Sequence, residues 1–364
     1  EIFNKRFTKR GFLAKLCKSQ VNMSTSISDY IIATIGSHTA LQILKGAKDE
    51  GFRTVAICTP KSKKVYESYG VADEIIEIET YEDYFKIEPQ LVEQNAIMIP
   101  HGSFVSYLGH KRVKDDTKVM YYGSKGILEW EADRGMERQW LKKAGLNLPK
   151  IFSDPSEIDR PVIIKFHGAK GGFGYFIAHS PEEFKEKIKA FPDENDFVIQ
   201  EYVVGVPMYV HYFHSPLTGE LEIMSFDKRY ESNADSIGRI AAQDQIDAGI
   251  QTSYTVTGNI PVVVRESMLP MFFEIGESVV RESKNLAGVP KGLFGPFCLE
   301  GIIDPNLNFR VFEISARIVA GTNPFTNGSP YSWLRYNEPM STGRRLAREI
   351  KQGIESNRLE ELLG

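Results

Sequence analysis

The sequence of 364 residues has few cysteines, no long apolar run and no strong excess of one charge. Its three cysteines, Cys17, Cys58 and Cys298, are too few and too scattered for a disulfide framework or a zinc cluster. No run of about 18 apolar residues occurs, so we expect no transmembrane helix. A formal net charge of −4 argues against a general nucleic-acid binder. These absences predict a cytoplasmic globular protein, with neither nucleic acid nor a membrane as its partner.

What is present is an ordinary globular composition, with 42% hydrophobic and 25% charged residues. The length exceeds what one core usually fills, so we expect two or three lobes. Residues 1–22 hold six of the 44 lysines and arginines but only one of the 48 acids. The rest of the chain therefore has a formal net charge of 38 minus 47, or −9. We expect residues 1–22 to be an extension outside the fold, with Met23 as the natural start. A basic arm or a targeting segment is the alternative.

From Tyr30 onward, short apolar runs alternate with helical patterns. Strands are expected at 30–35, 53–58, 74–78 and 96–99, and helices at 39–51, 63–70 and after 104. This alternation predicts a parallel, doubly wound sheet, in which ligands bind outside the carboxyl ends of the strands. The loops GSHT (36–39) and PHGSF (100–104) follow two of these strands, so His38, His101 and Ser103 are candidate ligand contacts. Tight turns with incidental surface histidines are the alternative.

After Tyr122 the pattern becomes mixed. Helices are expected over 128–146, from the capping box Ser180-Pro181-Glu182-Glu183 to about 191, and over 266–286, and strands at 161–165, 175–178, 197–200, 206–215 and 221–230. The last two strands flank the turn LTGE, which predicts an antiparallel pair. A second, mixed part of the fold therefore follows the parallel sheet.

The stretch CLEGIIDPNLNFRVFEISAR reads as a β-hairpin with the turn PNLN. Residues whose numbers sum to 613 would then pair, with Glu300 opposite Glu313 and Cys298 opposite Ser315. Like charges about 5 Å apart destabilise a sheet, and a divalent cation bound by the carboxylates removes that cost. The period of two also places Glu313, Ser315 and Arg317 on one face. Solvated acids on an edge strand are the alternative.

The stretch PVIIKFHGAKGGFGYF places Lys165 at the end of a strand, before a loop with four glycines in seven residues. Such a loop lets backbone amides approach phosphate oxygens, as in a lid, although a plain glycine hairpin is the alternative. Downstream, an apolar strand runs into the segment Gln200-Glu201-Tyr202-Val203, whose backbone groups could meet an adenine edge. By itself, that segment reads better as a core strand leaving the sheet.

Together and in this order, these segments resemble the ATP-grasp ligases. Members of that superfamily carry a lysine before a glycine-rich lid, then an adenine-binding connector, and then two acidic metal ligands in the pattern E…E-x-N-x-R. Here the last part is Glu300…Glu313-Ile-Ser-Ala-Arg317, and the serine puts a third metal-ligating side chain in doubt. The resemblance spans about 30 to 340. It implies an ATP-grasp fold, α/β and α+β, with a Rossmann-like parallel-sheet domain at 23–122, a lid subdomain at 123–206 and a metal-bearing subdomain at 207–364.

A closer likeness lies in the strings ATIGSHTALQILKGAKDEGF, IPHGSF, GNIPVVVRES and FEISARIVAGTN. They are similar to the archaeal-type, formate-dependent ligases that formylate 5-aminoimidazole-4-carboxamide ribonucleotide (AICAR) late in purine biosynthesis. The resemblance implies that ATP, formate and AICAR give ADP, phosphate and the formylated product FAICAR through formyl phosphate. It also implies Mg²⁺ or Mn²⁺ and a homo-oligomer. Another ATP-grasp carboxylate–amine ligase, or a non-catalytic purine-nucleotide sensor, are the alternatives.

The same resemblance assigns roles to individual residues. The implied AICAR contacts are His38, Ser103 and Asn259; the metal ligands are Glu300 and Glu313; and the catalytic residues are Arg317 and Lys165. The implied ATP contacts are Lys165, Gly171, Gly172, Gly174, Gln200, Glu201, Tyr202, Val203 and Glu231. An earlier phosphate-binding lysine is left open among Lys125, Lys142 and Lys143.

Overall fold

The computed structural model describes residues 26–166, 175–191, 196–250 and 254–364. The expected extension over 1–22 and the candidate phosphate contacts Gly171, Gly172 and Gly174 lie outside these ranges. Three sheets make up the described fold, one parallel and two antiparallel. None of the described helices has the length and apolar character needed to cross a bilayer.

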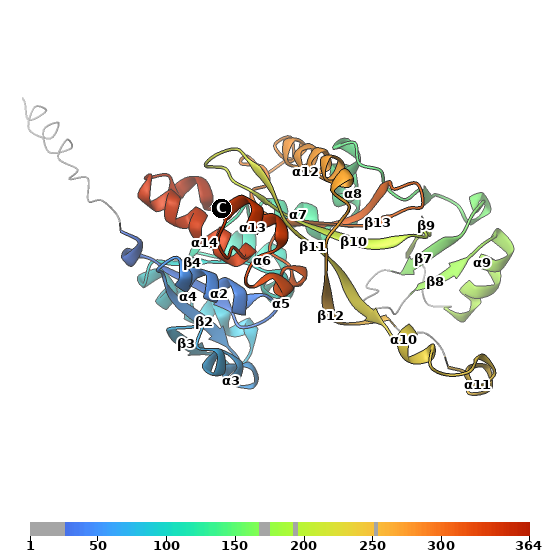
Figure 1. Cartoon of the computed structure of the whole chain (residues 1–364), viewed down its shortest axis with the longest axis horizontal. Coiled ribbons are helices and arrows are strands. Elements are labelled where there is room, and N and C mark those ends of the chain that lie inside the picture. The colour runs from blue at the N-terminus through green and yellow to red at the C-terminus, as the bar shows by residue number, and fades with distance from the viewer. Residues whose placement is uncertain (1–25, 167–174, 192–195, 251–253) are drawn as a thin grey trace, which may run out of the picture.

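The N-terminal domain is a parallel sheet with the strand order β3-β2-β1-β4-β5 (Figure 1). Its strands are β1 (Ile31–Ile35), β2 (Arg53–Cys58), β3 (Glu74–Glu77), β4 (Ala96–Met98) and β5 (Met120–Tyr121), and its helices are α2 (Ala40–Asp49), α3 (Pro60–Tyr69), α4 (Tyr84–Glu93), α5 (Gly102–Leu108) and α6 (His110–Asp116). This confirms the predicted doubly wound sheet. The strand order reverses between β1 and β4, and ligands of such sheets bind at that switch point.

A four-stranded antiparallel sheet with the order β6-β9-β7-β8 lies at the opposite end of the molecule (Figure 1). It contains β6 (Ile151–Phe152), β7 (Val162–Phe166), β8 (Tyr175–Ala178) and β9 (Phe197–Glu201), with helix α9 (Pro181–Lys187) beside it. Ser180 caps α9 by accepting the backbone N–H of Glu183, as the sequence predicts. The helix ends at Lys187, and a short 3-10 turn, Ile188–Ala190, completes the segment. We call this unit the lid sheet.

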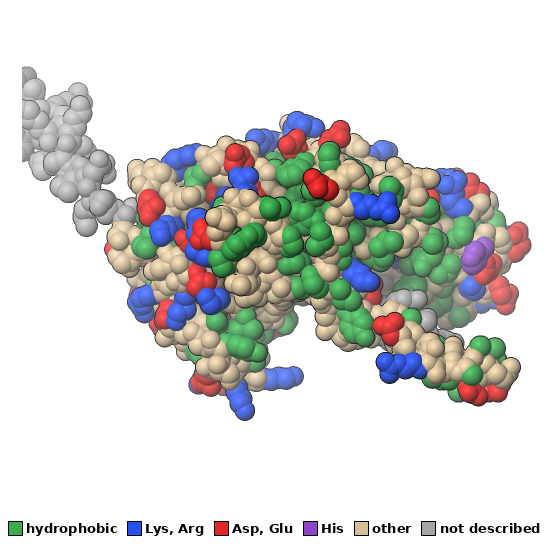
Figure 2. Space-filling model, in the orientation of Figure 1, with side chains coloured by type: hydrophobic (Ala, Val, Ile, Leu, Met, Phe, Trp, Pro, Cys, Tyr) green, Lys and Arg blue, Asp and Glu red, His purple; other side chains and the backbone are tan. Residues whose placement is uncertain are grey.

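The central sheet is antiparallel, with the order β12-β11-β10-β13-β14. Its strands are β10 (Val206–His214), β11 (Leu221–Ser232), β12 (Tyr254–Val262), β13 (Gly295–Ile303) and β14 (Phe309–Ser315). The later helices are α10 (Ala234–Ile237), α11 (Ala242–Asp247), α12 (Leu269–Ser283), α13 (Pro330–Tyr336) and α14 (Thr342–Glu355). Helices α10 and α11 sit on an arm between β11 and β12, and the surface is notched between this arm and the N-terminal domain (Figure 2).

The single helix expected over 128–146 is wrong. Two helices take its place, α7 (Ile127–Ala132) and α8 (Arg134–Lys143). Asp133 between them has an extended backbone, and its carboxylate accepts the N–H groups of Gly135 and Met136 at 2.9 Å each. Aspartate is among the strongest N-cap residues, so a capping residue inside the helical pattern began a new helix.

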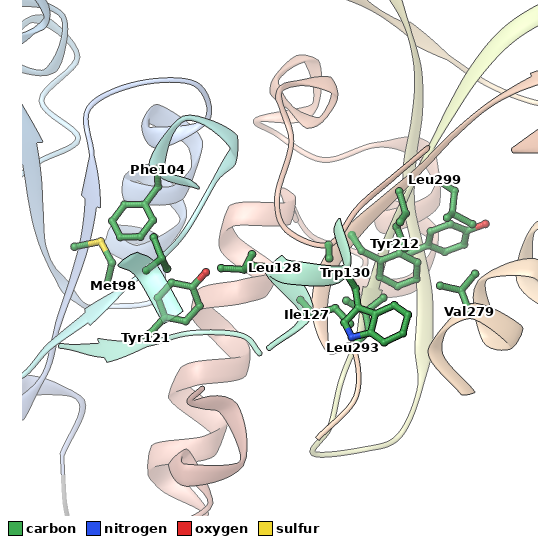
Figure 3. Packing of buried hydrophobic residues seen from close by; sticks show 14 of the residues in the cluster. Met98, Phe104, Tyr121, Ile127, Leu128, Trp130, Tyr212, Val279, Leu293 and Leu299 are labelled. Atoms are coloured by element: carbon green, nitrogen blue, oxygen red, sulfur yellow. The ribbon is translucent and has the colours of Figure 1, made fainter. Parts of the chain in front are cut away.

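Helix α7 joins the N-terminal domain to the central sheet. Its Ile127, Leu128 and Trp130 belong to one buried cluster (Figure 3). The cluster runs from Met98, Phe104 and Tyr121 on one side to Tyr212, Val279, Leu293 and Leu299 on the other. The indole N–H of Trp130 donates to the Ala287 carbonyl at 3.1 Å, so the one polar group of this side chain is satisfied. The two domains thus share a core.

The C-terminal end returns to the N-terminal domain. Helix α14 packs on α2, and a Cβ atom added at Gly46 would lie only 2.6 Å from the carbonyl carbon of Gly343. Leu363 bridges Tyr122, and the N–H of Gly364 donates to the Tyr121 carbonyl at 2.9 Å. The last residues of the chain therefore extend the edge of the first sheet.

The crossing of α2 and α14 predicts that Gly46→Ala destabilises the protein. Helix propensity alone would make the alanine variant more stable than the natural protein by roughly 0.5–1 kcal/mol. The added methyl group would meet backbone atoms of α14, which cannot rotate away, and overpacking of this kind costs about 1–3 kcal/mol. We expect a lower melting temperature in a thermal denaturation experiment.

Lys45→Ala, on the exposed side of the same helix, is the control and should change stability by less than about 0.5 kcal/mol. A melting temperature for Gly46→Ala above that of the natural protein would contradict the close crossing.

Candidate active site

Polar side chains occupy alternate positions on one face of the central sheet. One register row contains Asp227 (β11), Tyr209 (β10), Glu300 (β13) and Glu313 (β14), and the next contains His211 (β10), Cys298 (β13) and Ser315 (β14). All seven line a single cavity of about 340 Å³. Because the side chains of a strand alternate between faces, this arrangement depends on the pairing register of four strands.

The predicted pairing of Glu300 with Glu313 and of Cys298 with Ser315 is confirmed. Arg317 follows the end of β14 and lines the same cavity as Glu313 and Ser315, as expected. Serine therefore stands in the cavity where the superfamily pattern has asparagine. Its hydroxyl lies 3.5 Å from a carboxylate oxygen of Glu300.

The predicted register is wrong nearer the turn. The loop spans 304–308, and Ile303 pairs with Phe309, so the paired numbers there sum to 612. Phe312 is the extra residue of a β-bulge, which restores the sum of 613 at Glu313. The bulge lets Phe309 face the core while Glu313 faces the cavity, although both have odd numbers on one strand.

Glu300 is a buried acid beside another acid. Its exposed fraction is 3%, and burial together with the charge of Glu313 raises the pKa of its carboxyl to about 8. The guanidinium of Arg229 donates to the second oxygen of Glu300. Glu313 is exposed to the cavity. Arg229 therefore offsets part of the negative charge on the Glu300 side of the acid pair.

This acid pair suits a divalent cation that also binds phosphate. Among the described residues, no group of three or more His, Cys, Asp or Glu side chains could hold a metal ion without other ligands. Magnesium usually takes only one or two protein carboxylates and completes its shell with water and substrate phosphates. Glu300 and Glu313, hard oxygen donors in facing positions, fit that pattern.

Two glutamates from the broken helix secure the outer edge of β14. Glu137 of α8 accepts the N–H of Ile314 at 2.7 Å, and Glu131 of α7 accepts the N–H of Ala316 at 3.1 Å. Glu131 also pairs with Arg317 at 2.8 Å. Burial, with the neighbouring acids, raises the pKa of Glu137 to about 9. Sequence reasoning missed both residues, because helical acids resemble solvated ones.

The loops after β1 and β4 meet at the switch point. The rings of His38 and His101 stack with centroids 5.3 Å apart, and the Ser37 hydroxyl donates to the Ser103 hydroxyl at 3.1 Å. His38 lines the cavity of the acid pair. Burial first, then His101 and Arg317, lowers the pKa of His38 to about 3, so its imidazole is neutral at physiological pH. His101 is fully buried, and one ring nitrogen lies 3.0 Å from the Ile35 carbonyl.

Arg317 reaches the same loops from the central sheet. A Cβ atom at Gly102 would lie 2.9 Å from Nε2 of His38 and 3.0 Å from Nη1 of Arg317. Next to the arginine, Ile318 forms a parallel bridge with His101. The cavity therefore has one wall from the N-terminal domain and one from the central sheet.

A second cavity, of about 420 Å³, lies between the lid sheet and the β14 edge. Lys165 of β7 lines it, and its ammonium donates to the Gln200 side chain at 3.4 Å and lies 5.9 Å from the Phe312 ring centroid. Burial and then the charge of Arg134 lower the pKa of Lys165. Glu313 lines this cavity as well as the first, so the acid pair stands where the two cavities adjoin.

The other expected ATP contacts are placed differently. Glu201, Tyr202, Val203 and Glu231 line neither cavity. The carboxylate of Glu201 accepts a hydrogen bond from the Arg310 guanidinium at 2.7 Å and another from the N–H of Lys150 at 2.9 Å. The bond from Arg310 ties the lid sheet to β14. Tyr202 is exposed beyond the end of β9. As ATP contacts, these residues stay predictions.

Arginines line the second cavity where the sequence suggested a lysine. Lys125, Lys142 and Lys143 are all absent from its lining. Lys125 donates to the Thr117 carbonyl at 3.2 Å, and the other two are exposed on α8. Arg134 and Arg138 of the same helix line the cavity beside Lys165. After the break, helix α8 therefore brings two arginines to the second cavity.

Asn259 lies on β12 and lines the first cavity, opposite Arg229 in the register. Its amide donates to Asp227, which also contacts His211. Sequence reasoning missed Asp227, Arg229 and His211. Their signal was available: polar residues at a period of two inside apolar strands mark a face that meets something other than the core.

Comparison with known proteins identifies the family. The regions 32–152 and 179–364 match two family descriptions, "Protein of unknown function (DUF1246)" and "Domain of unknown function (DUF1297)". The chain is 57% identical over 338 residues to a 5-formaminoimidazole-4-carboxamide-1-(beta)-D-ribofuranosyl 5'-monophosphate synthetase of Thermococcus kodakarensis, covering 91% of this chain and 99% of the relative. The synthetase of Pyrococcus horikoshii is 56% identical, with the same coverage. The chain belongs to this synthetase family.

Solved structures agree with that family. The crystal structure of an IMP biosynthesis protein PurP from Thermococcus kodakaraensis has a TM-score of 0.73 and 30% identity, covering 92% of this chain and 100% of that one. N5-carboxyaminoimidazole ribonucleotide synthetase from Thermotoga maritima, at 18% identity, has a TM-score of 0.57 and covers 88% of this chain and 75% of its own. This second likeness shows the fold alone. The chain is an ATP-grasp ligase by family, as the sequence predicted.

For this synthetase, Glu137→Ala should lower the free energy of unfolding by about 1–3 kcal/mol or more, because it leaves the buried N–H of Ile314 without an acceptor. Glu137→Gln keeps an acceptor oxygen in place and should cost less than about 1 kcal/mol. Urea denaturation of the three proteins measures the difference. Equal losses for both substitutions would show that the hydrogen bond to β14 is not the source of the effect.

Proposed function

We propose that the protein formylates the 5-amino group of AICAR, using ATP and formate and releasing FAICAR, ADP and phosphate, in IMP biosynthesis. The observation that carries the proposal is the position of Glu313, which lines both cavities. The acid pair, proposed to hold a metal ion, stands between a cavity lined by a lysine and a cavity lined by His38 and Asn259. This arrangement suits a reaction in which ATP activates one substrate for attack by another. The names of the relatives, which are FAICAR synthetases, support the same reaction.

ATP is assigned to the cavity below the lid sheet. Transfer of a phosphoryl group depends on positioning and charge neutralisation more than on covalent catalysis. Lys165, Arg134 and Arg138 supply three cations there, and a bound polyphosphate would offset the burial that lowers the pKa of the lysine. The adenine edge is assigned to Gln200, Glu201, Tyr202 and Val203, and further contacts to Glu231, Gly171, Gly172 and Gly174, as the family resemblance implies.

A divalent cation, Mg²⁺ or Mn²⁺, is assigned to Glu300 and Glu313. When bound, it would supply positive charge that offsets the negative charge of the ATP phosphates. Arg229 holds one oxygen of Glu300, which fixes the direction of the carboxylate. The Ser315 hydroxyl, at 3.5 Å from the same carboxylate, supports its position and need not be a ligand.

The proposed chemistry has two steps. A formate oxygen attacks the γ-phosphorus of ATP, and the bond to ADP breaks, which gives formyl phosphate. The 5-amino nitrogen of AICAR then attacks the formyl carbon, phosphate leaves with the electron pair of the C–O bond, and the nitrogen loses one proton. Arg317, fixed by Glu131 and beside His38, would place a positive charge near the leaving phosphate.

AICAR is assigned to the first cavity, at the switch point of the N-terminal sheet. His38, Ser103 and Asn259 are its proposed contacts. His38 would meet it as a neutral imidazole, because burial holds its pKa at about 3. The ligand would then bridge the N-terminal domain and the central sheet. Homo-oligomer formation and a cytoplasmic location stay predictions.

The reaction is tested by incubating the protein with ATP, Mg²⁺ and AICAR, with and without formate. We expect ADP and FAICAR in equal amounts, by chromatography and mass spectrometry, only when formate is present. Acetate in place of formate is the control and should give neither product. ADP release with another carboxylate would favour a different ligase, and AICAR binding without turnover with any carboxylate would favour a sensor.

Glu313→Gln separates the metal role from substrate binding. We expect kcat to fall at least 100-fold, because the substitution removes a metal-ligating charge, while the Kd for AICAR changes less than about threefold. Glu355→Gln, at the exposed end of α14, is the matched control and should leave both values unchanged. If Glu313→Gln keeps more than a tenth of the natural kcat, the carboxylate is not a required ligand.

A further inference from the structure

His211, Asp227 and Asn259 form a hydrogen-bonded chain in the wall of the first cavity, separate from the acid pair of Glu300 and Glu313. The side chains of His211 and Asp227 are 2% and 1% exposed, and Asn259 is half-buried. Nε2 of His211 lies 2.7 Å from Oδ1 of Asp227, and Nδ2 of Asn259 lies 2.7 Å from Oδ2 of Asp227. Both oxygens of one buried carboxylate are thus occupied. The proposal above uses Asn259 as an AICAR contact but gives no role to His211 or Asp227.

Asp227 determines which way the Asn259 amide points. An asparagine amide can often be placed in two orientations, because its nitrogen and oxygen are alike in size. A carboxylate only accepts hydrogen bonds, so the atom of Asn259 that faces Asp227 must be the donor nitrogen. The amide oxygen then lies on the other side. Within the described chain this oxygen accepts no hydrogen bond. It is also not one of the buried side-chain atoms that lack a hydrogen-bond partner.

His211 and a glycine hold Asp227 in place. Because the carboxylate accepts, Nε2 of His211 carries the hydrogen of their bond. A Cβ atom at Gly321 would lie 2.6 Å from Cε1 of His211 and would overlap the Asp227 carboxylate, so only a glycine backbone can close over the pair. Hydrogen bonds from two donors offset the desolvation of a buried carboxylate, whereas the loss of either donor costs folding free energy.

We infer that Asp227, backed by His211, is a positioning residue that presents the amide oxygen of Asn259 to a neutral hydrogen-bond donor of the substrate. The inference rests on the proposed function, which puts AICAR in this cavity. AICAR offers such donors in its amine, its carboxamide and its ribose hydroxyls. An acceptor oxygen in front of a buried carboxylate repels a phosphate, so the contact is with the nucleoside part of the ligand.

Asp227→Asn tests the orientation. The new amide keeps its oxygen toward His211, because moving the ring hydrogen to Nδ1, which has no partner among the described residues, would bury an unpaired donor. Its NH₂ group then faces Asn259, whose amide must turn and offer its own NH₂ group to the cavity. We expect the Kd for AICAR, by calorimetry, to rise about tenfold or more, with the Kd for ATP and the melting temperature little changed.

The exchanged pair is the matched control. In Asn259→Asp alone, two carboxylates face each other, and AICAR should again bind about tenfold or more weakly at neutral pH. In the double variant D227N/N259D, the net charge is that of the natural protein, the amide at 227 must donate to the carboxylate at 259, and an acceptor oxygen again faces the cavity. We expect AICAR affinity within about threefold of the natural value.

Two outcomes would overturn the inference. The first is natural or tighter AICAR binding by Asp227→Asn, since loss of a negative charge would help only if the contact were a phosphate. The second is a double variant that melts normally and binds AICAR as weakly as Asn259→Asp.

Asn259→Ala keeps the test decisive if the double variant is unstable. It should weaken AICAR and its riboside, which lacks the phosphate, by the same factor. A loss confined to AICAR would mean that Asn259 reads the phosphate, against the inference. If the natural protein binds neither compound, the proposed function fails instead.

Discussion

The register of the central antiparallel sheet is the constraint on which the site depends. A slip of one residue would turn the facing carboxylates of Glu300 and Glu313 into the core and bring apolar residues into the cavity. The bulge at Phe312 makes the two halves of β14 compatible, because it lets Phe309 pack inward while Glu313 faces out. Gly301, across from the bulge, has no room for a side chain, since a Cβ atom there would lie 2.7 Å from the Arg310 carbonyl. The bulge is therefore part of the site.

Strand β14 is also the edge of its sheet, and its outer backbone groups are paired by other elements. Glu137 accepts the N–H of Ile314, Glu131 accepts that of Ala316 just after the strand, and the Glu201–Arg310 pair ties the strand to the lid sheet. An edge covered in this way is protected from pairing with another chain, and its side chains are held still. Since preorganised charges act without reorganisation cost, an edge held in this way suits the phosphoryl transfer proposed above. The shared core around α7 does the same for the contact between the two domains.

Much of the fold follows from local patterns. Alternating apolar runs and helical patterns predicted the parallel sheet, and turn and capping residues placed the lid strands and α9. The pattern failed where two local signals competed: Asp133 lies inside a continuous helical pattern, and its capping bonds ended α7 and began α8. It also could not predict that α14 would pack on α2, because a crossing through Gly46 depends on residues far apart in the chain.

For the site itself, the sequence determined the residues whose relations are local. Glu300 and Glu313 face each other because a hairpin of this length pairs them, and the loops of the N-terminal sheet meet because parallel strands end at one edge. Only the tertiary structure decided the roles of Glu131, Glu137 and Asp227. An acid on a helix, or in the middle of a strand, carries no sign in the sequence of the backbone amide or side chain it will meet. Those partners come from other elements, up to 185 residues away along the chain, and burial turns an ordinary acid into a structural one.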